Sequence, residues 1–202
     1  MRGAELTPAT VYRGYVHRAF PMAEDDGTIQ WYRPNVRALF PIRGAHVSRS
    51  MRRVLQSGTF QVTFDRAFRE VMHGCLRPED NWIDEQIIRV FTEIHHEGWG
   101  HSCEVWRGDE LVGGLYGIAI GAYFAAESMF HRETNASKVA LISMVDRCRA
   151  EGFVLFDAQI MNPHLQRMGA FELRDRDFER ALQAACDIET QWGRCPHHAP
   201  NH

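Results

Sequence analysis

The stretch from residue 101 to residue 160 constrains the fold more than any other part of this sequence. Residues 101–120 alternate like two strands and turn at Gly108–Asp109, which predicts a hairpin. Residues 121–130 predict a further strand, and the spacing of apolar residues in 135–151 predicts a helix that Asn135 caps and Gly152 closes. The short apolar run 153–160 predicts a buried strand. This order of elements is typical of an α+β sheet of the kind that acyltransferases use.

Capping residues and periodicity predict the other elements. We expect helices at 8–20 after Thr7, at 49–57 after Ser48, at 65–74, from Asn81 or Asp84 to residue 98, and at about 177–190. Strands are expected near 29–32 and at 59–64. The fold class is therefore α+β: an acetyltransferase-like (GNAT-type) mixed sheet flanked by helices, with a small N-terminal appendage. We expect a short N-terminal segment, 1–34, and a catalytic domain, 35–202.

The predicted buried strand at 153–160 carries two polar residues near its end, Asp157 and Gln159. Successive side chains of a strand point to opposite faces, so Asp157 and Gln159 share one face, opposite Phe156. They are either the solvated face of an edge strand or a carboxylate and carboxamide presented together for chemistry. Glu127 lies among apolar residues, where an unpaired carboxylate is costly. It either pairs with an arginine or points into the same cleft as Asp157.

The region before the 135–151 helix argues against acyl-CoA as the donor. Acetyltransferases of the usual kind hold the cofactor pyrophosphate on a Gly-rich turn at the start of this helix. The corresponding stretch here, ESMFHRETNASK, has no glycine. Acyl transfer from another donor is therefore the expectation. The histidines at 95, 96 and 101 and in the tail CPHHAPNH lack the spacing of a zinc site, so we expect no metal.

The charge distribution suggests a phosphate partner, although the formal net charge is only −3. Residues 31–73 hold eight arginines against two carboxylates, a local formal charge of +6. Such a basic sector suits a nucleic-acid backbone. The alternative is that arginine is simply the usual cation of a chain whose single lysine is Lys138.

Length and composition predict an ordinary soluble protein. No run approaches 18 apolar residues, and the N-terminus has no apolar signal region. Five scattered cysteines without a CxxC pair suit reduced thiols, and hence a cytoplasmic location.

Taken together, the motifs resemble the leucyl/phenylalanyl-tRNA–protein transferase family. The matching pieces, in family order, are WYRPNVRALFP, HVSRSM, WID, HSCEVWRGDELVGGLYG, ESMF, NASKVAL, DAQ and HLQRMGA. The resemblance implies an acetyltransferase-like domain that uses aminoacyl-tRNA in place of acyl-CoA and needs no other cofactor. The implied reaction moves Leu or Phe, and sometimes Met, onto the N-terminal Arg or Lys of a protein, which marks that protein for N-end-rule degradation.

The resemblance also assigns roles to individual residues. Asp157 and Gln159 match the catalytic DxQ pair, while Glu127 and Asn162 match positions that contact the aminoacyl and peptide groups. The pocket for the amino-acid side chain is expected to involve Met129, Met144, Cys148 and Phe156. The tRNA is expected to contact Arg37, Arg49, Arg52, Arg53, Trp82 and Met22. Trp82 would lie near the 3′ adenosine, and Met22 stands where many members have a stacking tryptophan.

Two alternatives stay open, and the second is suggested by Met22 and by an N-terminal segment that is shorter than is common in the family. One is an acetyltransferase-fold enzyme with a different acyl donor. The other is a module that binds tRNA or protein N-termini with weakened catalysis.

Overall fold

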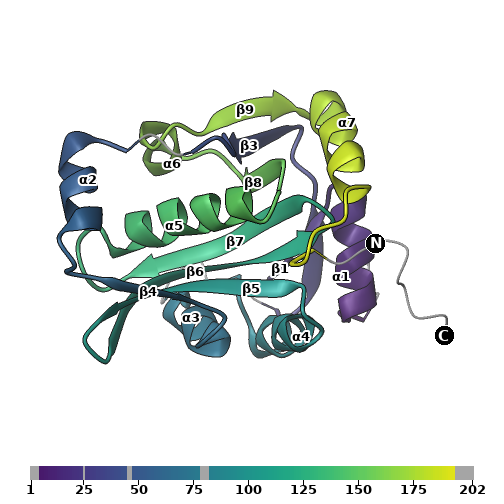
Figure 1. Cartoon of the computed structure of the whole chain (residues 1–202). Coiled ribbons are helices and arrows are strands. Elements are labelled where there is room, and N and C mark those ends of the chain that lie inside the picture. The colour runs from purple at the N-terminus through teal and green to yellow at the C-terminus, as the bar shows by residue number, and fades with distance from the viewer. Residues whose placement is uncertain (1–4, 25, 45–46, 78–81, 194–202) are drawn as a thin grey trace.

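The computed structural model describes residues 5–24, 26–44, 47–77 and 82–193, and its centre is a seven-stranded mixed sheet (Figure 1). The strand order is β4-β5-β6-β7-β8-β3-β9, in which β7 and β8 run parallel and the other neighbours run antiparallel. The bounds are β3 (Val36–Phe40), β4 (Gln61–Phe64), β5 (Gly100–Arg107), β6 (Glu110–Ile120), β7 (Tyr123–His131), β8 (Leu155–Gln159) and β9 (Phe171–Arg174). A two-stranded sheet is formed by β1 (Phe20–Ala23) and β2 (Ile29–Tyr32).

Helices cover both faces of the large sheet, so two hydrophobic cores form (Figure 1). The bounds are α1 (Pro8–Val16), α2 (Arg49–Gln56), α3 (Phe68–Gly74), α4 (Glu85–His96), α5 (Ala136–Ala150), α6 (Pro163–Arg167) and α7 (Asp175–Cys186). Buried residues of α5 form one core with Phe124 and Phe156. Buried residues of α1, α3, α4 and α7 form the other core with Tyr116 and Tyr123. The predicted α+β class, a mixed sheet flanked by helices, is confirmed.

The capping residues explain why several predicted helices begin where they do. The side chains of Thr7, Ser48 and Asp84 each accept a hydrogen bond from a backbone N–H three residues later, which satisfies a donor that the helix itself leaves unpaired. The predicted hairpin is also confirmed, because β5 and β6 pair up to Arg107 and Glu110.

Some local predictions are wrong. The first helix ends at Val16 rather than at residue 20, because the chain turns there to enter β1. Asn135 precedes α5 with φ of 73° and makes no side-chain cap to the helix; its Oδ1 accepts instead from Lys138 Nζ at 3.3 Å. Four short elements, β1, β3, α6 and β9, were not predicted. The omission of β3 matters most, because it forms the neighbour of β8.

The strands β7 and β8 pair only over a short stretch. Tyr123–Ala125 face Leu155–Asp157, and the parallel pairing stops there although β7 continues to His131. The register of β7 against β6 shifts just beyond this point, so that Glu127 has no partner residue on β6. Such an irregularity redirects a side chain. It places Glu127 where the two parallel strands part.

The N-terminal segment shares a core with the rest of the chain. Leu6, Val11 and Phe20 pack in the same cluster as α3 and α4, and the backbone N–H of Ala23 donates to the carbonyl of Trp82. The boundary at 34/35 stays a prediction.

Asn81, a candidate for the start of a helix, and the histidine-rich tail lie outside the described residues. Within the residues that the structure describes, no helix is long and apolar enough to span a membrane.

Candidate functional site

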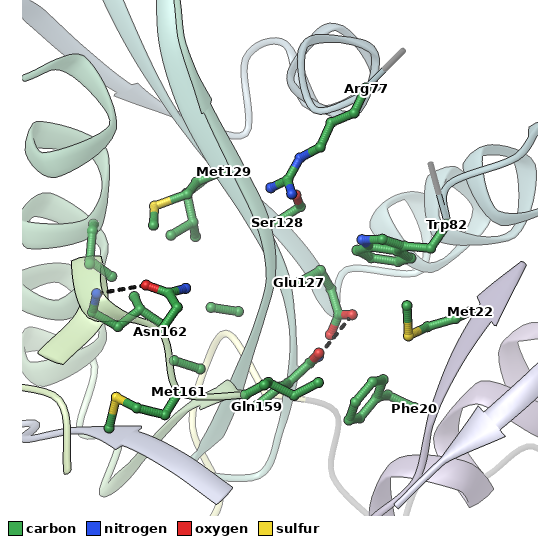
Figure 2. Close-up of a pocket in the computed structure, with 16 residues that line it drawn as sticks. Phe20, Met22, Arg77, Trp82, Glu127, Ser128, Met129, Gln159, Met161 and Asn162 are labelled. Carbon is green, nitrogen blue, oxygen red and sulfur yellow. Dashed lines mark hydrogen bonds between the residues drawn. The ribbon is translucent and has the colours of Figure 1, made fainter. Parts of the chain in front are cut away.

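A cavity of about 260 Å³ opens where β7 and β8 part (Figure 2). Its walls come from both strands, from the segment after β8, and from β1, β6, α5 and α6. The volume lies slightly below the range of about 300–1,000 Å³ that is usual for small-molecule sites. The lining residues include Glu127 and Gln159 at the polar part and Leu115, Met129, Leu141, Met161 and Leu165 at the apolar part.

Glu127 is the carboxylate that lines this cavity. Its Oε2 accepts a hydrogen bond from Nε2 of Gln159 at 3.0 Å, while its buried Oε1 has no hydrogen-bond partner among the described residues. The Tyr15 hydroxyl approaches Glu127 and favours its charged form, but the two groups do not meet hydrogen-bond geometry. Burial dominates and raises the pKa of Glu127 to about 7. Glu127 therefore lines a cavity, but Asp157 does not share it as we expected, and no arginine among the described residues forms an ion pair with Glu127.

Asp157 lies beneath the cavity and does not line it. Its side chain is fully buried, and its Oδ2 accepts from the Tyr123 hydroxyl at 2.7 Å and from Arg37 Nη2. Its Oδ1 accepts from the backbone N–H of Gln159 at 2.8 Å and from Arg37 Nε at 3.3 Å. Asp157 therefore holds the backbone of Gln159 rather than facing a ligand.

Gln159 has a left-handed backbone with φ of 62°, an uncommon conformation for a residue with a side chain. Strained backbone of this kind costs about 1–3 kcal/mol and persists only where the surroundings fix it. The hydrogen bond to Asp157 is one such restraint, and the side-chain bond to Glu127 is another. The shared face of Asp157 and Gln159 was predicted correctly, but their side chains engage different partners.

The prediction that Arg37 contacts tRNA is wrong. We expected it to contact tRNA phosphates, yet it is only 1% exposed. Its guanidinium lies 5.1 Å from the ring centroid of Phe20 and 4.8 Å from that of Phe178, and it pairs with Asp157. Burial alone would lower the pKa of Arg37, but the adjacent Asp157 carboxylate outweighs it and raises that pKa. A guanidinium enclosed in this way cannot reach a nucleic-acid backbone.

The expected side-chain pocket is partly wrong. Met129 lines the cavity, but Met144, Cys148 and Phe156 belong to the core under α5. The residue of α5 that reaches the cavity is Leu141, one helical turn before Met144. The reason is that β7 and β8 remain paired beside Phe156 and close the space there. Sequence reasoning missed the lining residues Leu115, Ala126, Ser128, Leu141, Ala158, Ile160, Met161 and Leu165. For Leu141, its place in the quoted run NASKVAL was an available signal.

The other side of the cavity is formed by Phe20, Met22, Trp82 and Arg77 (Figure 2). Trp82 and Met22 thus both line the cavity, although they are separated by 60 positions in the chain, and their expected contact with tRNA stays a prediction. Arg77 and Phe20 were not predicted. Only position in space reveals them, because neither belongs to a recognisable motif.

Asn162 also lines the cavity, at the start of α6. Its Oδ1 accepts from the backbone N–H groups of His164 and Leu165, both at 2.9 Å. Figure 2 shows one dashed line at the Asn162 side-chain oxygen. The side chain therefore caps the helix and keeps its amide group at the cavity wall.

Arg49, Arg52 and Arg53 are exposed on α2, away from this cavity. The described residues contain no cluster of three or more His, Cys, Asp or Glu that could hold a metal.

Residues 39–183 match the family described as leucyl/phenylalanyl-tRNA protein transferase, and residues 4–35 match the N-terminal domain described for the same family. This α+β protein is therefore an aminoacyltransferase. The chain belongs to the leucyl/phenylalanyl-tRNA–protein transferase family.

Three relatives with this name support the assignment. The protein from Roseobacter denitrificans is 44% identical over 90% of this chain and 87% of its own. That from Salinibacter ruber is 42% identical over 93% of this chain and 84% of its own. That from Herpetosiphon aurantiacus is 41% identical over 89% of this chain and 94% of its own.

Proposed function

We propose that this protein transfers Leu or Phe, and also Met, from aminoacyl-tRNA to the N-terminal Arg or Lys of acceptor proteins in the cytoplasm, marking them for N-end-rule degradation. The observation that carries the proposal is the Oε1 of Glu127, which is buried beside an apolar wall and has no hydrogen-bond partner in the part of the chain that the structure describes. A carboxylate oxygen of this kind accepts a hydrogen bond from an ammonium group, and Met129 and Leu141 suit an aliphatic or aromatic side chain. An apolar aminoacyl group carries both features.

The donor ester is already activated, so no separate cofactor is required. The acceptor amine has a reference pKa of about 7.7–8.0, so a useful fraction is neutral near pH 7. Positioning can then supply much of the rate, up to about 7–11 kcal/mol in favourable systems. In this proposal the cavity orients the neutral amine against the ester carbonyl. The bond to the tRNA 3′ oxygen breaks as the amide forms, and the proton that the amine loses passes to that oxygen, so no strong base is needed.

We assign roles from the contacts described above. Glu127 holds the α-amino group of the donor. The NH₂ of Gln159 is engaged by Glu127, so its carbonyl oxygen accepts the hydrogen bond from the attacking amine. Asp157, paired with Arg37, fixes the backbone of Gln159 and so positions the side chain that meets the amine. The Asn162 amide or a backbone N–H stabilises the oxyanion.

The remaining parts of the site suit the tRNA. Trp82 and Met22 lie together at one side of the cavity, where the 3′ adenosine would stack. The exposed arginines 49, 52 and 53 on α2 would follow acceptor-stem phosphates without reading bases.

We also propose that the large sheet is acetyltransferase-like (GNAT-type). The observed order of the β5–β6 hairpin, β7, α5 and β8 supports this proposal.

The test is a transfer assay with radiolabelled Leu-, Phe- and Met-tRNA and a peptide that starts with Arg or Lys. We expect label on the free-amine peptide and none on its N-acetylated control. Asp157→Asn should lower transfer strongly while tRNA affinity is kept. Robust turnover of an acyl-CoA without tRNA would favour a different acyl donor. Binding of tRNA without transfer would favour a binding module.

A further inference from the structure

A second cavity, of about 220 Å³, lies between α2, the start of α5 and α6. Figure 1 shows α2 beyond the N-terminal end of α5, with α6 nearby. Among its lining residues are Ser48, Ser50, Asn135, Lys138, His164 and Arg167. No carboxylate lines this cavity among the residues that the structure describes. We call it the α5–α6 cavity.

The cations of the α5–α6 cavity are not neutralised. Within the described part of the chain, Lys138 and Arg167 form no ion pair. Burial, and then the charges of Lys138, Arg167 and His131, lowers the pKa of His164. Two cations therefore line a cavity to which no described residue brings a negative charge.

The nearest acidic residues along α5 are engaged elsewhere. Glu133 pairs with Arg107, and near the far end of the helix Asp146 and Glu151 pair with Arg149 and Arg147. Helix α2, which lines the same cavity, carries three exposed arginines and no carboxylate. These arginines belong to the same helix whose residues Ser50, Met51 and Val54 line the α5–α6 cavity.

Two further features prepare this cavity for an anion. Nε2 of His164 is buried and has no hydrogen-bond partner among the described residues, which is costly in the absence of a ligand. The 15-residue helix α5 begins here without a side-chain cap, because Asn135 has a left-handed backbone and bonds Lys138. The positive end of a long helix favours an anion at this point.

The α5–α6 cavity adjoins the site between β7 and β8. Lys138 precedes the lining residue Leu141 by three positions on α5, which is about 4.5 Å along a helix. On α6, His164 lines one cavity and its neighbour Leu165 lines the other. If the single-stranded 3′ end of a tRNA came in along α2, it would cross the α5–α6 cavity before its aminoacyl group reached Glu127.

We propose that Lys138, His164 and Arg167, with the N-terminal end of α5, bind a backbone phosphate near the 3′ end of the donor tRNA. The inference rests on the proposed function and extends it to a specific contact. Cations, a helix terminus and two serine hydroxyls recognise phosphate, whereas the lining residues present no Phe, Tyr or Trp for stacking of a base. The contact is therefore independent of tRNA sequence.

The experiment compares two donors that carry the same amino acid: leucyl-tRNA, and 3′-leucyl-adenosine, which has no phosphate. The variant is Lys138→Gln with Arg167→Gln. The control is Arg89→Gln with Arg180→Gln, which removes two exposed arginines on α4 and α7 and changes the net charge equally. Thermal melting of both proteins establishes that they are folded.

We expect the Lys138/Arg167 variant to raise KM for leucyl-tRNA at least tenfold at low salt, with kcat and turnover of leucyl-adenosine unchanged. The slope of log KM against log salt should fall by about 0.7 for each single-strand phosphate that the variant no longer neutralises. The control should alter neither donor by more than about twofold, as expected for exposed pairs.

Equal losses with both donors would overturn the proposal, because the residues would then act on the reaction rather than on a phosphate. Unchanged KM with both donors would also overturn it. If the wild-type protein transfers from neither donor, the proposed function itself fails. Anisotropy of a fluorescent uncharged tRNA then decides the phosphate contact separately: weaker binding by the Lys138/Arg167 variant than by the control supports it, and equal binding refutes it.

Discussion

The Nε of Arg37 lies 3.3 Å from Oδ1 of Asp157, although the two residues are 120 positions apart in the chain. The pair is buried between Phe20 and Phe178, and the same Asp157 oxygen accepts the backbone N–H of Gln159. A charge pair beneath the cavity thus supports the residue that we assign to the attacking amine. Arg37 acts through Asp157 and is a positioning residue.

Loss of Arg37 should destabilise the fold strongly. Arg37→Met leaves the buried Asp157 carboxylate without its charge partner, which should lower the free energy of unfolding by about 3–5 kcal/mol. Adding Asp157→Asn removes the unpaired charge and should recover part of that loss. Urea unfolding measures both. Arg180→Met, which breaks an exposed pair with Asp177, should cost less than about 1 kcal/mol. An equally small cost for Arg37→Met would contradict this account.

Stability should depend on pH through Glu127. Burial raises the pKa of this carboxyl from 4.5 to about 7, so the folded state binds more protons than the unfolded chain between these values. The free energy of unfolding should therefore fall as pH rises across this window, by about 3 kcal/mol from this group. Glu127→Gln should remove that component, as measured by urea unfolding from pH 4.5 to 8. Glu110→Gln, at an exposed position on β6, is the control. Parallel pH profiles for wild type and Glu127→Gln would refute the assignment.

Gln159→Gly should separate stability from activity. Glycine adopts positive φ without strain, which offsets the lost hydrogen bond to Glu127, so the free energy of unfolding should change by less than about 1 kcal/mol. Transfer should fall at least a hundredfold, because the amine loses its hydrogen-bond acceptor. Single-turnover transfer with saturating leucyl-tRNA reports the rate. A variant that keeps a third or more of the wild-type rate would exclude Gln159 from this role.

Donor preference should follow the wall of the cavity and not the core behind it. Leu141→Ala widens the wall and should raise the ratio of kcat/KM for Phe-tRNA over Leu-tRNA about tenfold. Met144→Ala, one turn further along α5 in the core, should cost about 2–5 kcal/mol of stability but leave the ratio unchanged. If Met144→Ala shifted the ratio of kcat/KM for Phe-tRNA over Leu-tRNA, Met144 would belong to the side-chain pocket, as expected from the sequence.

Trp82 and Met22 should control affinity for the 3′ adenosine. Trp82→Ala should weaken binding of leucyl-adenosine by about 1–3 kcal/mol, the usual value for one base stacked on an aromatic ring. Met22→Trp should change affinity in the opposite direction, because it adds a second stacking surface beside Trp82. Inhibition of transfer by uncharged adenosine analogues measures both effects. Unchanged inhibition in Trp82→Ala would place the adenosine elsewhere.

The sequence by itself determined the elements whose signals are local. Thr7, Ser48 and Asp84 begin their helices as predicted, because an N-cap acts on backbone groups three residues away. The period of two along β8 correctly placed Asp157 and Gln159 on the face opposite Phe156. The order of the motifs also identified the family, because a full set of short motifs is specific even where each one is weak.

Only the tertiary structure decided which residues meet. The short strand β3 carries no strong local signal, and its pairing with β8 turned Arg37 from an expected surface cation into the buried partner of Asp157. The place where β7 and β8 part selected Leu141 instead of Met144 for the cavity. The same packing placed Lys138 of α5 and Arg167 of α6 at one cavity. These contacts depend on how distant segments pair and pack, and local propensity and periodicity do not encode that.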